Sequence, residues 1–371
     1  MSTRLWMVSM MATAMLACSA GPAGTGFGPV GGSDGTGAVS DDGGAPSVNT
    51  GNGSSGGTDP QGAPPAPAPV FSDAAAGQTY DTYIPKTEIA ETKTLTIAPF
   101  LVKAGDEVYM CQQFANPFGR DVDLVKMDGQ MSTGSHHFFV FNMSPATGRN
   151  TAAPLGPCPG AGLEFHPYIF LSQQPNWSVV YPEADMGYPL PAANGLMMNV
   201  HFLNATASDV MAQATITITA AVPGAVTKLV GNLFLNNQGM SVPVTPKSNP
   251  IWIPATTVPI ADHDYQIIQS WSHMHQWGVD FQASLGSAAT PFYDETHWDS
   301  PPVVNHIPPI QVKSGTPFTW RCQYYNDTGA TLTFGDSARS SVMCIYFGIY
   351  YPVTLPTSDP DYPDIVSVVQ L

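Results

Sequence analysis

Five of the nine histidines fall in three short motifs, and imidazole nitrogens are good ligands for transition metals. The motifs are His136-His137, Asn199-Val200-His201 and His273-Met274-His275. Each lies in a run rich in β-branched and aromatic residues, which predicts a strand. Residues i and i+2 of a strand share a face, so His273 and His275 could bind one ion together. Alone, such a pair is equally compatible with two half-buried histidines.

His136 and His137 are harder to place on one ion. Adjacent strand residues point to opposite faces. Both rings can reach one ion only at a strand end, or if one ring binds through its inner nitrogen. His201 ends an apolar run and is a candidate third ligand, although a lone histidine there is more often part of the core.

Met343 adds a donor of a different kind. It precedes Cys344 in an apolar run, and core packing is the alternative interpretation because the chain has 16 methionines. A thioether is a soft ligand, and histidine combined with methionine favours copper over zinc, calcium or magnesium.

Four cysteines, Cys111, Cys158, Cys322 and Cys344, allow three disulfide pairings. The simplest pairs neighbours along the chain, Cys111 with Cys158 and Cys322 with Cys344. Both bonds would form in an oxidising compartment. Four buried free thiols are the alternative.

The N-terminus predicts export. Arg4 is followed by a thirteen-residue apolar stretch, residues 5–17, which is too short to span a bilayer. Residues 1–18 therefore read as a signal peptide that resembles the bacterial lipoprotein type, with Cys18 as the lipidated residue. Met15 stands where that type usually has leucine, and ordinary cleavage or an unmodified Cys18 remains the alternative.

The composition predicts an all-β protein with an N-terminal tether. Residues 19–70 are rich in Gly, Ser and Pro and have too few large apolar residues to fold, so they predict a flexible tether. From residue 71 onward, short runs typical of strands alternate with turn residues, and no amphipathic helix of normal length is visible. We expect two antiparallel jelly-roll or β-sandwich domains, 71–222 and 223–371. The expected strands are 94–101, 107–113, 136–142, 196–203, 215–221, 267–272, 278–285, 317–325 and 342–351.

The charge balance excludes some partners. Only 11% of residues are charged and the net charge is −16. Nucleic-acid binding requires clustered Lys and Arg, so it is not expected. Attraction to an anionic membrane surface is also disfavoured, and membrane contact is expected only through the lipid anchor. The oligomeric state does not follow from the sequence.

The order of the motifs resembles a known family. Along the chain they are Tyr109-Met110-Cys111, His136-His137, His201, His273-Met274-His275, Trp320-Arg321-Cys322, Phe334-Gly335-Asp336, Met343-Cys344 and Tyr350-Tyr351-Pro352. This pattern, over roughly residues 88–355, resembles the copper type II ascorbate-dependent monooxygenases, the family of dopamine β-monooxygenase and peptidylglycine α-hydroxylating monooxygenase.

The resemblance implies two jelly-roll domains that face each other across a cleft, with one copper in each. The implied ligands are His136, His137 and His201 for an electron-transfer copper, and His273, His275 and Met343 for an oxygen-activating copper. It also implies the Cys111–Cys158 and Cys322–Cys344 disulfides, and it matches Tyr109 to a tyrosine near the first copper. Dioxygen, a small-molecule substrate and ascorbate or a similar reductant are the implied reactants.

The departures from the family concern the substrate. The peptide-amidating branch binds its substrate carboxylate with Arg, Asn and Tyr, and Trp271, Ile345 and Phe347 stand at those positions here. A buried carboxylate would lose its charge partner at a cost of several kcal/mol. A neutral apolar or aromatic substrate is therefore expected. Val342 replaces an acidic residue with no evident consequence.

Three hypotheses about function follow. The first is a copper-dependent monooxygenase that hydroxylates a C–H bond. The second is a non-catalytic copper-binding or copper-sensing surface lipoprotein, and intact ligands do not separate it from the first. The third is a structural or adhesive domain whose histidines bind nothing.

Overall fold

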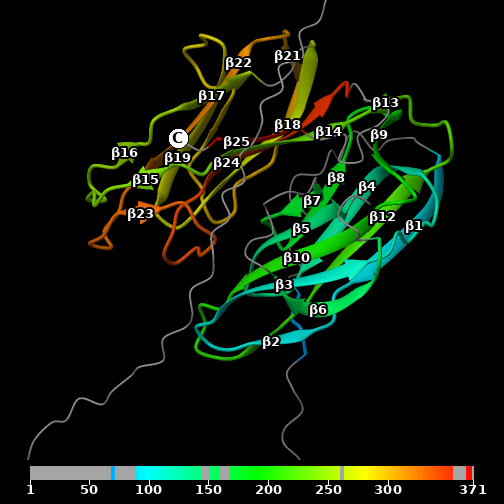
Figure 1. Cartoon of the computed structure of the whole chain (residues 1–371), viewed down its shortest axis with the longest axis horizontal. Coiled ribbons are helices and arrows are strands. Elements are labelled where there is room, and N and C mark those ends of the chain that lie inside the picture. Colours follow the sequence, from blue (N-terminus) through cyan, green and yellow to red (C-terminus); the bar gives the residue numbers. More distant parts are fainter. Residues whose placement is uncertain are drawn as a thin grey trace, which may run out of the picture. The chain divides into compact units, whose positions relative to one another are not determined.

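The computed structural model describes residues 68–71, 88–143, 150–158, 168–259, 263–353 and 365–369, all within one compact unit, Pro64–Leu371. The regular structure of these ranges is β-strand throughout, as predicted, with no helix among them (Figure 1). No helix that could cross a membrane occurs in this part of the chain. The predicted signal peptide, Cys18 and the tether as far as residue 67 lie outside the described residues.

Strands β1–β13, here called the N-terminal half, form three sheets. In spatial order, the first sheet contains β1 (Ile89–Thr96), β12 (Ala214–Ala221), β4 (Val122–Met131), β9 (Met186–Leu190) and β13 (Lys228–Leu229), with β8 (Asn176–Val180) also paired to β4. The second contains β6 (Ala153–Pro157), β3 (Glu107–Phe114), β10 (Gly195–Leu203), β5 (Ser135–Met143) and β7 (Tyr168–Ser172). The third pairs β11 (Val210–Ala212) with β2 (Phe100–Val102).

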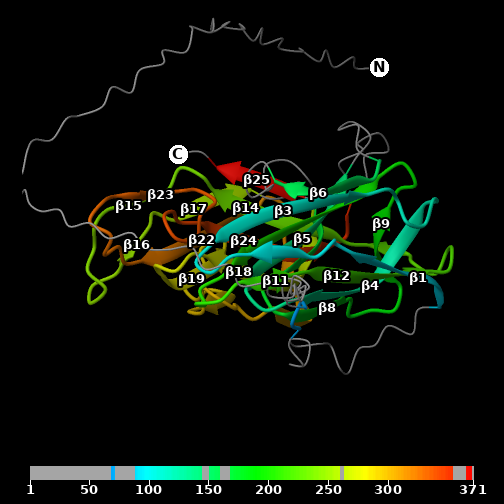
Figure 2. The ribbon, with the colours of Figure 1, turned by 90° about the horizontal axis from the view of Figure 1, so that it is seen from below.

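Strands β14–β25, the C-terminal half, also form three sheets, and Figure 2 shows them from a second side. The first contains β21 (Val304–Val312), β18 (Tyr265–Met274), β24 (Cys344–Tyr351), β14 (Gly231–Asn237) and β25 (Ile365–Val369). The second contains β16 (Ile251–Trp252), β22 (Pro317–Tyr324), β19 (Gly278–Leu285) and β20 (Tyr293–Glu295), with β17 (Thr256–Pro259) also on β22. The third pairs β15 (Ser241–Val242) with β23 (Leu332–Thr333).

The two larger sheets of the N-terminal half pack face to face at Gly129. A Cβ atom at Gly129 of β4 would lie 2.2 Å from Cζ of Phe170 on β7. The Phe170 ring therefore packs directly against the backbone of β4, and any side chain at position 129 would separate the sheets there.

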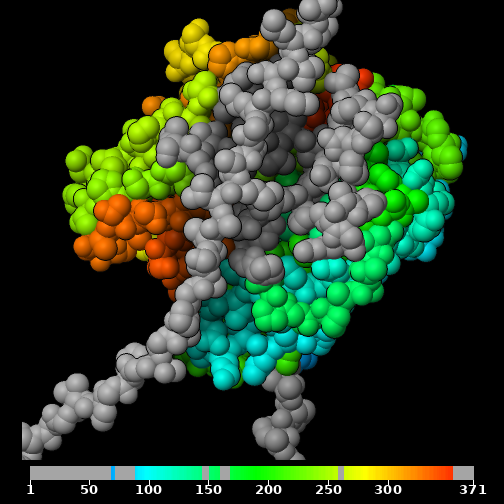
Figure 3. Space-filling model, viewed as in Figure 1, coloured from blue at the N-terminus to red at the C-terminus, as the bar shows by residue number. Residues whose placement is uncertain are grey.

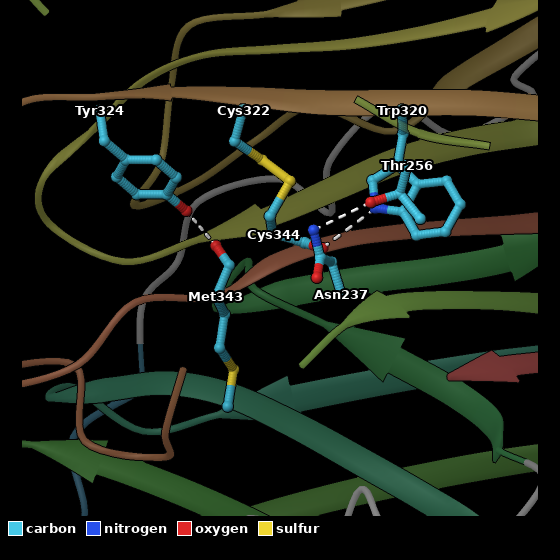
Figure 4. The surroundings of a disulfide bond; sticks show 7 residues. All are labelled: Asn237, Thr256, Trp320, Cys322, Tyr324, Met343 and Cys344. Atoms are coloured by element: carbon cyan, nitrogen blue, oxygen red, sulfur yellow. Dashed lines mark hydrogen bonds between the residues drawn. A yellow bond between two sulfur atoms is a disulfide. The ribbon is translucent and has the colours of Figure 1, made fainter. Parts of the chain in front are cut away.

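The two larger sheets of the C-terminal half are joined by a disulfide. Cys322 of β22 is bonded to Cys344 of β24 (Figure 4). Beside it, the Trp320 indole donates a hydrogen bond to the Cys344 carbonyl at 3.2 Å, and the Tyr324 hydroxyl donates one to the Met343 carbonyl. The start of β24 is thus held to β22 by covalent and polar links.

Side-chain alternation gives β18 and β24 two different faces. On one face, Trp271 and Phe347 belong to a core cluster shared with the N-terminal half. On the other face, Met274 and Tyr346 belong to a second cluster within the C-terminal half. The face that carries Trp271 also carries the candidate ligands.

A polar ladder joins β1 to β12. Three threonine pairs are hydrogen-bonded through their Oγ1 atoms: Thr92 with Thr219 at 3.4 Å, Thr94 with Thr217 at 3.0 Å, and Thr96 with Thr215 at 3.0 Å. These pairs lie directly opposite each other in the register, as cross-strand partners do.

The expected strands agree with the observed ones apart from their ends. The run 94–101 is divided between β1 and β2, and 342–351 becomes a strand only from Cys344. β12 ends at Ala221, close to the predicted boundary, but β13 beyond it pairs with β9. The division into domains 71–222 and 223–371 therefore stays a prediction.

Candidate metal centre

Tyr109, His201 and His137 form one row across three neighbouring strands. In the registers of β3, β10 and β5, His201 lies opposite Tyr109 on one side and His137 on the other. The Tyr109 ring stacks on the His201 ring with centroids 3.8 Å apart and an interplanar angle of 14°. The Nδ1 atom of His201 lies 3.3 Å from the Nε2 atom of His137.

A β-bulge brings His136 to the same place. The β5–β10 register shifts by one residue between His201 and Phe202, where Ser135 pairs with Phe202 and His137 with His201. His136 is the extra residue, and a bulge redirects the side chain that it carries. The His136 ring centroid lies 5.3 Å from that of His137 and 5.1 Å from that of His201. Two adjacent histidines therefore join one cluster through a bulge at the start of β5.

His273 and His275 reach this cluster from the C-terminal half. Their ring centroids lie 5.2 Å apart, as expected for residues on the same side of β18. The potential ligand atoms of His136, His273 and His275 all lie within 4.8 Å of one another. The His137 ring centroid is 5.5 Å from that of His273. The five histidines thus form one five-histidine cluster. The His136 ring lies between the other two pairs, with its centroid 5.1 Å from that of His201, 5.4 Å from that of His273 and 6.2 Å from that of His275.

Hydrogen bonds to the other ring nitrogens fix which nitrogens of this cluster are free. Nδ1 of His273 bonds to Oε1 of Gln173 at 2.5 Å, and Nδ1 of His275 bonds to the Ser341 carbonyl at 2.9 Å. Because both acceptors require an N–H donor, the Nε2 atoms of these two histidines carry lone pairs. Nε2 of His201 bonds to Oε1 of Glu107 at 2.9 Å, which leaves its Nδ1 as the ligand atom.

Four nitrogens of the five-histidine cluster are buried with no hydrogen-bond partner. They are His136 Nε2, His137 Nδ1, His273 Nε2 and His275 Nε2. Buried polar atoms in native proteins nearly always have a partner. Three of the four belong to His136, His273 and His275, whose ligand atoms lie within 4.8 Å of one another, and together they indicate a metal ligand set.

Burial keeps the cluster neutral. Desolvation, with the neighbouring imidazoles, lowers the pKa of His136, His137 and His273 well below the usual range. Desolvation lowers the pKa of His275 to about 4, although the hydrogen bond from its ring to the Ser341 carbonyl acts to raise the pKa. Metal binding requires deprotonated imidazole, so these rings are ready ligands at neutral pH.

Glu107 was not anticipated from the sequence. Besides His201, its carboxylate accepts hydrogen bonds from the Ser337 hydroxyl and the Ala338 amide, both at 2.8 Å. Desolvation acts to raise the pKa of Glu107, but these three donors outweigh it and lower the pKa to about 2. The ionised carboxylate holds the His201 ring in one orientation. Its position two residues before Tyr109, on the same face of β3, was the available signal in the sequence.

Gln173 and Ser341, which orient His273 and His275, carried no such signal. Gln173 follows β7, about 100 residues before its partner, and Ser341 contributes a backbone carbonyl rather than a side chain. Only the tertiary structure brings these groups to the imidazoles.

Met343 lies beside the cluster in the register of β18 and β24. The last two pairs of this ladder are His273 with Ile345 and Met274 with Cys344. His275 directly follows β18 and Met343 directly precedes β24, so both residues lie at this end of the ladder. Met343 is 1% exposed and belongs to the core cluster shared by the two halves. Figure 4 shows its side chain extending away from the Cys322–Cys344 bond.

The predicted substrate residues form an apolar wall next to the metal ligands. Trp271 and Phe347 are directly paired and stack at 5.9 Å, and Phe347 also stacks on Phe234 at 5.3 Å. Ile345 pairs with His273. Trp271, Ile345 and Phe347 are all buried. None of the three wall residues, nor Phe234 beside them, has a charged side chain.

Both predicted disulfides are present, Cys111–Cys158 and Cys322–Cys344. This confirms the pairing and is typical of an oxidising environment. These four cysteines therefore supply no thiolate, so the donors gathered at the site are imidazoles with a thioether nearby. Such a set suits copper, or zinc, better than the oxygen-binding magnesium or calcium.

Comparisons with known proteins identify no family. No protein-family model matches the sequence, and no curated protein matches it. Among solved structures, the major capsid protein P2 of bacteriophage PM2 is 8% identical, with a TM-score of 0.31 over 72% of this chain and 99% of that one. A peptide-N(4)-(N-acetyl-β-D-glucosaminyl) asparagine amidase is 10% identical, with a TM-score of 0.31 over 71% and 97% of the two chains. These scores are too low to carry a functional argument.

Proposed function

We propose that this protein is a copper-dependent monooxygenase that hydroxylates a C–H bond of a small neutral apolar or aromatic molecule, with dioxygen and a reductant such as ascorbate. The observation that carries the proposal is the five-histidine cluster, with four buried nitrogens that lack partners. His136, His137, His201, His273, His275 and Met343 would hold two copper ions per chain.

Copper is favoured over zinc by the character of the donors. Zinc sites in proteins usually combine histidine with thiolate or carboxylate, and neither is gathered here as a free ligand. The nearby carboxylate of Glu107 is occupied by three hydrogen bonds. Met343 would add a soft thioether, which stabilises reduced copper. When bound, copper would supply the redox chemistry that activates dioxygen.

The residues of the chain would provide binding, orientation and exclusion of water. Gln173 and Ser341 present the Nε2 atoms of His273 and His275 to the site. The wall of Trp271, Ile345 and Phe347 would place an apolar substrate next to these ligands and keep water away from it. A substrate carboxylate would find no cation at this wall.

The remaining finer predictions form part of the same proposal. The two halves would be tandem jelly-roll domains, 71–222 and 223–371. The signal peptide of residues 1–18 would direct export and would be cleaved before Cys18. Lipidation of Cys18 would then anchor the protein to a membrane through the tether of residues 19–70.

The test is oxygen consumption by the copper-loaded protein with ascorbate and a panel of aromatic amines, followed by mass spectrometry of the products. We expect a hydroxylated product that is absent when His273→Ala is loaded with copper in the same way. Oxygen consumption no greater than that of the same amount of free copper would contradict the proposal.

One observation favours a second function, a non-catalytic copper-binding or copper-sensing surface lipoprotein. Trp271 and Phe347 stack on each other and are buried, which leaves the wall covered. Under this alternative, copper would bind tightly and no member of the substrate panel would be oxidised.

A further inference from the structure

Glu107 touches both a candidate ligand and a loop of the other half. Its Oε1 atom accepts hydrogen bonds from His201 Nε2 at 2.9 Å and from the Ala338 amide at 2.8 Å. Its Oε2 atom accepts one from the Ser337 hydroxyl at 2.8 Å. One carboxylate of β3 therefore holds a histidine of the N-terminal half and the segment 336–341, here called the bridging loop, of the C-terminal half.

The bridging loop carries the contact onward to His275. The Ser337 carbonyl accepts hydrogen bonds from the Ser341 amide at 3.0 Å and the Ser341 hydroxyl at 2.7 Å. The Ser341 carbonyl accepts the hydrogen bond from Nδ1 of His275 at 2.9 Å. An unbroken series of bonds thus runs from His201 through Glu107, Ser337 and Ser341 to His275.

The bridging loop is fastened at both ends. On the N-terminal half, the Tyr109 hydroxyl donates to the Asp336 carbonyl at 2.6 Å, and the Arg339 guanidinium donates to the Gly105 carbonyl. Figure 3 shows this orange part of the chain against the cyan N-terminal strands. Beyond the loop, Met343 is held by Tyr324 and Cys344 by its disulfide. The loop is thus attached to the N-terminal half on one side and adjoins a segment fixed to β22 on the other.

We propose that Glu107 is a positioning residue that couples the candidate ligands of the two halves, so that the orientation of His201 and the placement of His275 depend on one carboxylate. The inference deepens the proposed function and rests on it only for the identity of the metal. Groups that hold the second nitrogen of a ligating histidine tune the affinity and geometry of a metal site. Here one such group would serve ligands on both halves.

The first test uses the metal-free protein. Amide hydrogen exchange is measured for peptides covering residues 336–343 in Glu107→Ala, in Ser337→Ala and in the control Glu183→Gln. Glu183 is ion-paired to Lys228 on the surface of the N-terminal half. We expect exchange to be roughly tenfold faster in Glu107→Ala, because this variant loses hydrogen bonds to a charged group. The increase in Ser337→Ala should be smaller. Glu183→Gln should match the wild type.

A second readout on the same samples separates coupling from loosening of the bridging loop alone. The imidazole ¹⁵N signals of His275 should shift in both Glu107→Ala and Ser337→Ala, although neither residue touches that ring. Faster exchange with unchanged His275 signals would mean that only the bridging loop is loosened, and it would overturn the inference, as would wild-type exchange together with unchanged His275 signals. Ser337→Ala keeps the Glu107–His201 contact and removes a half-buried hydroxyl that bonds to Glu107 and to the Arg339 amide. It therefore gives a result even if Glu107→Ala does not fold.

Copper is added last, which keeps the two proposals distinguishable. With reduced copper, carbon monoxide is expected to bind to the copper held by His273, His275 and Met343. Its infrared stretching frequency should shift in Glu107→Ala and should not shift in Glu183→Gln. If the wild type binds no copper, the proposed function fails while the metal-free result still decides the role of Glu107. If copper binds and the stretch is the same in Glu107→Ala as in the wild type, the coupling is absent.

Discussion

Nδ1 of His201 and Nε2 of His137 lie 3.3 Å apart on neighbouring strands, directly opposite each other. Two nitrogens bound tetrahedrally to one ion at about 2.0–2.1 Å are separated by roughly 3.3 Å. The backbone register of β5 and β10 therefore sets these two imidazoles at a spacing that suits a shared metal ion as well as a hydrogen bond between them. Glu107 fixes the tautomer of His201 that this spacing requires.

We predict that purified protein binds two copper ions per chain under reducing, copper-replete conditions. His201→Ala should lower this to about one, because it removes one imidazole of the His137–His201 pair and leaves His273 and His275 in place. Metal analysis of dialysed samples measures both values. A wild-type content near zero or one would refute the assignment.

A comparison of His136→Ala with His137→Ala tests how the ligands are divided between the ions. The ligand atoms of His136 lie near those of His273 and His275, so His136→Ala should change the infrared stretch of carbon monoxide bound to the reduced protein. His137→Ala should remove the other copper and leave the stretch near its wild-type value. The reverse result would place His136 with His137 and His201, as the family resemblance implies.

Met343→His should keep the copper content near two but shift the carbon monoxide stretch and lower hydroxylation steeply, because imidazole is a harder donor than a thioether. Met240→Leu is the matched control, since Met240 is a buried methionine of the other core cluster. It should leave the stretch unchanged. Equal spectra for Met343→His and the wild type would remove Met343 from the ligand set.

The two disulfides should contribute differently to the site. Replacing Cys322 and Cys344 together by serine should lower the free energy of unfolding by about 3 kcal/mol and also alter the carbon monoxide stretch, because Cys344 adjoins Met343. Replacing Cys111 and Cys158, which are 47 residues apart, should destabilise at least as much and leave the stretch unchanged. Denaturant unfolding measures the stability. Identical spectra for the two double variants would show that the Cys322–Cys344 bond does not place the thioether.

Asp280 predicts a pH dependence of stability away from the candidate site. Desolvation and the nearby Asp294 raise its pKa from 3.8 to about 6. Between pH 3.8 and about 6, the folded state then binds more protons than the unfolded state. The contribution of Asp280 to the free energy of unfolding therefore falls as the pH rises through this range. Asp280→Asn should therefore raise the Tm at pH 7.5 and have little effect at pH 3.5. The control is Asp264→Asn. Asp264 is exposed and its pKa is lowered by a hydrogen bond from Lys313, so this variant should not raise the Tm at pH 7.5.

Much of the architecture could be predicted because it depends on local patterns. Alternating apolar residues and turn residues located the main strands, and sequence order suggested the disulfides. The side-by-side placement of His273 and His275 follows from the strand period alone.

The candidate site could be predicted only in part, because it depends on irregularities and long-range contacts. His136 joins the cluster through a one-residue bulge, and no local signal in Ser135-His136-His137 marks that bulge. The division of ligands into two separate sets was implied by the family resemblance. In the structure, packing between the halves brings His136 close to His273 and His275 as well as to His137 and His201.

The threonine ladder between β1 and β12 has a consequence for how the chain tolerates its surroundings. Ion pairs between exposed strands weaken as salt screens them, whereas hydroxyl–hydroxyl bonds carry no net charge and are not screened in this way. Because Thr92, Thr94 and Thr96 pair with neutral partners, these three contacts between β1 and β12 should be indifferent to ionic strength, while the ion pair between Glu91 and Arg120 should weaken as salt rises. In a chain with 11% charged residues, most of the side-chain attachment of β1 to β12 thus carries no net charge.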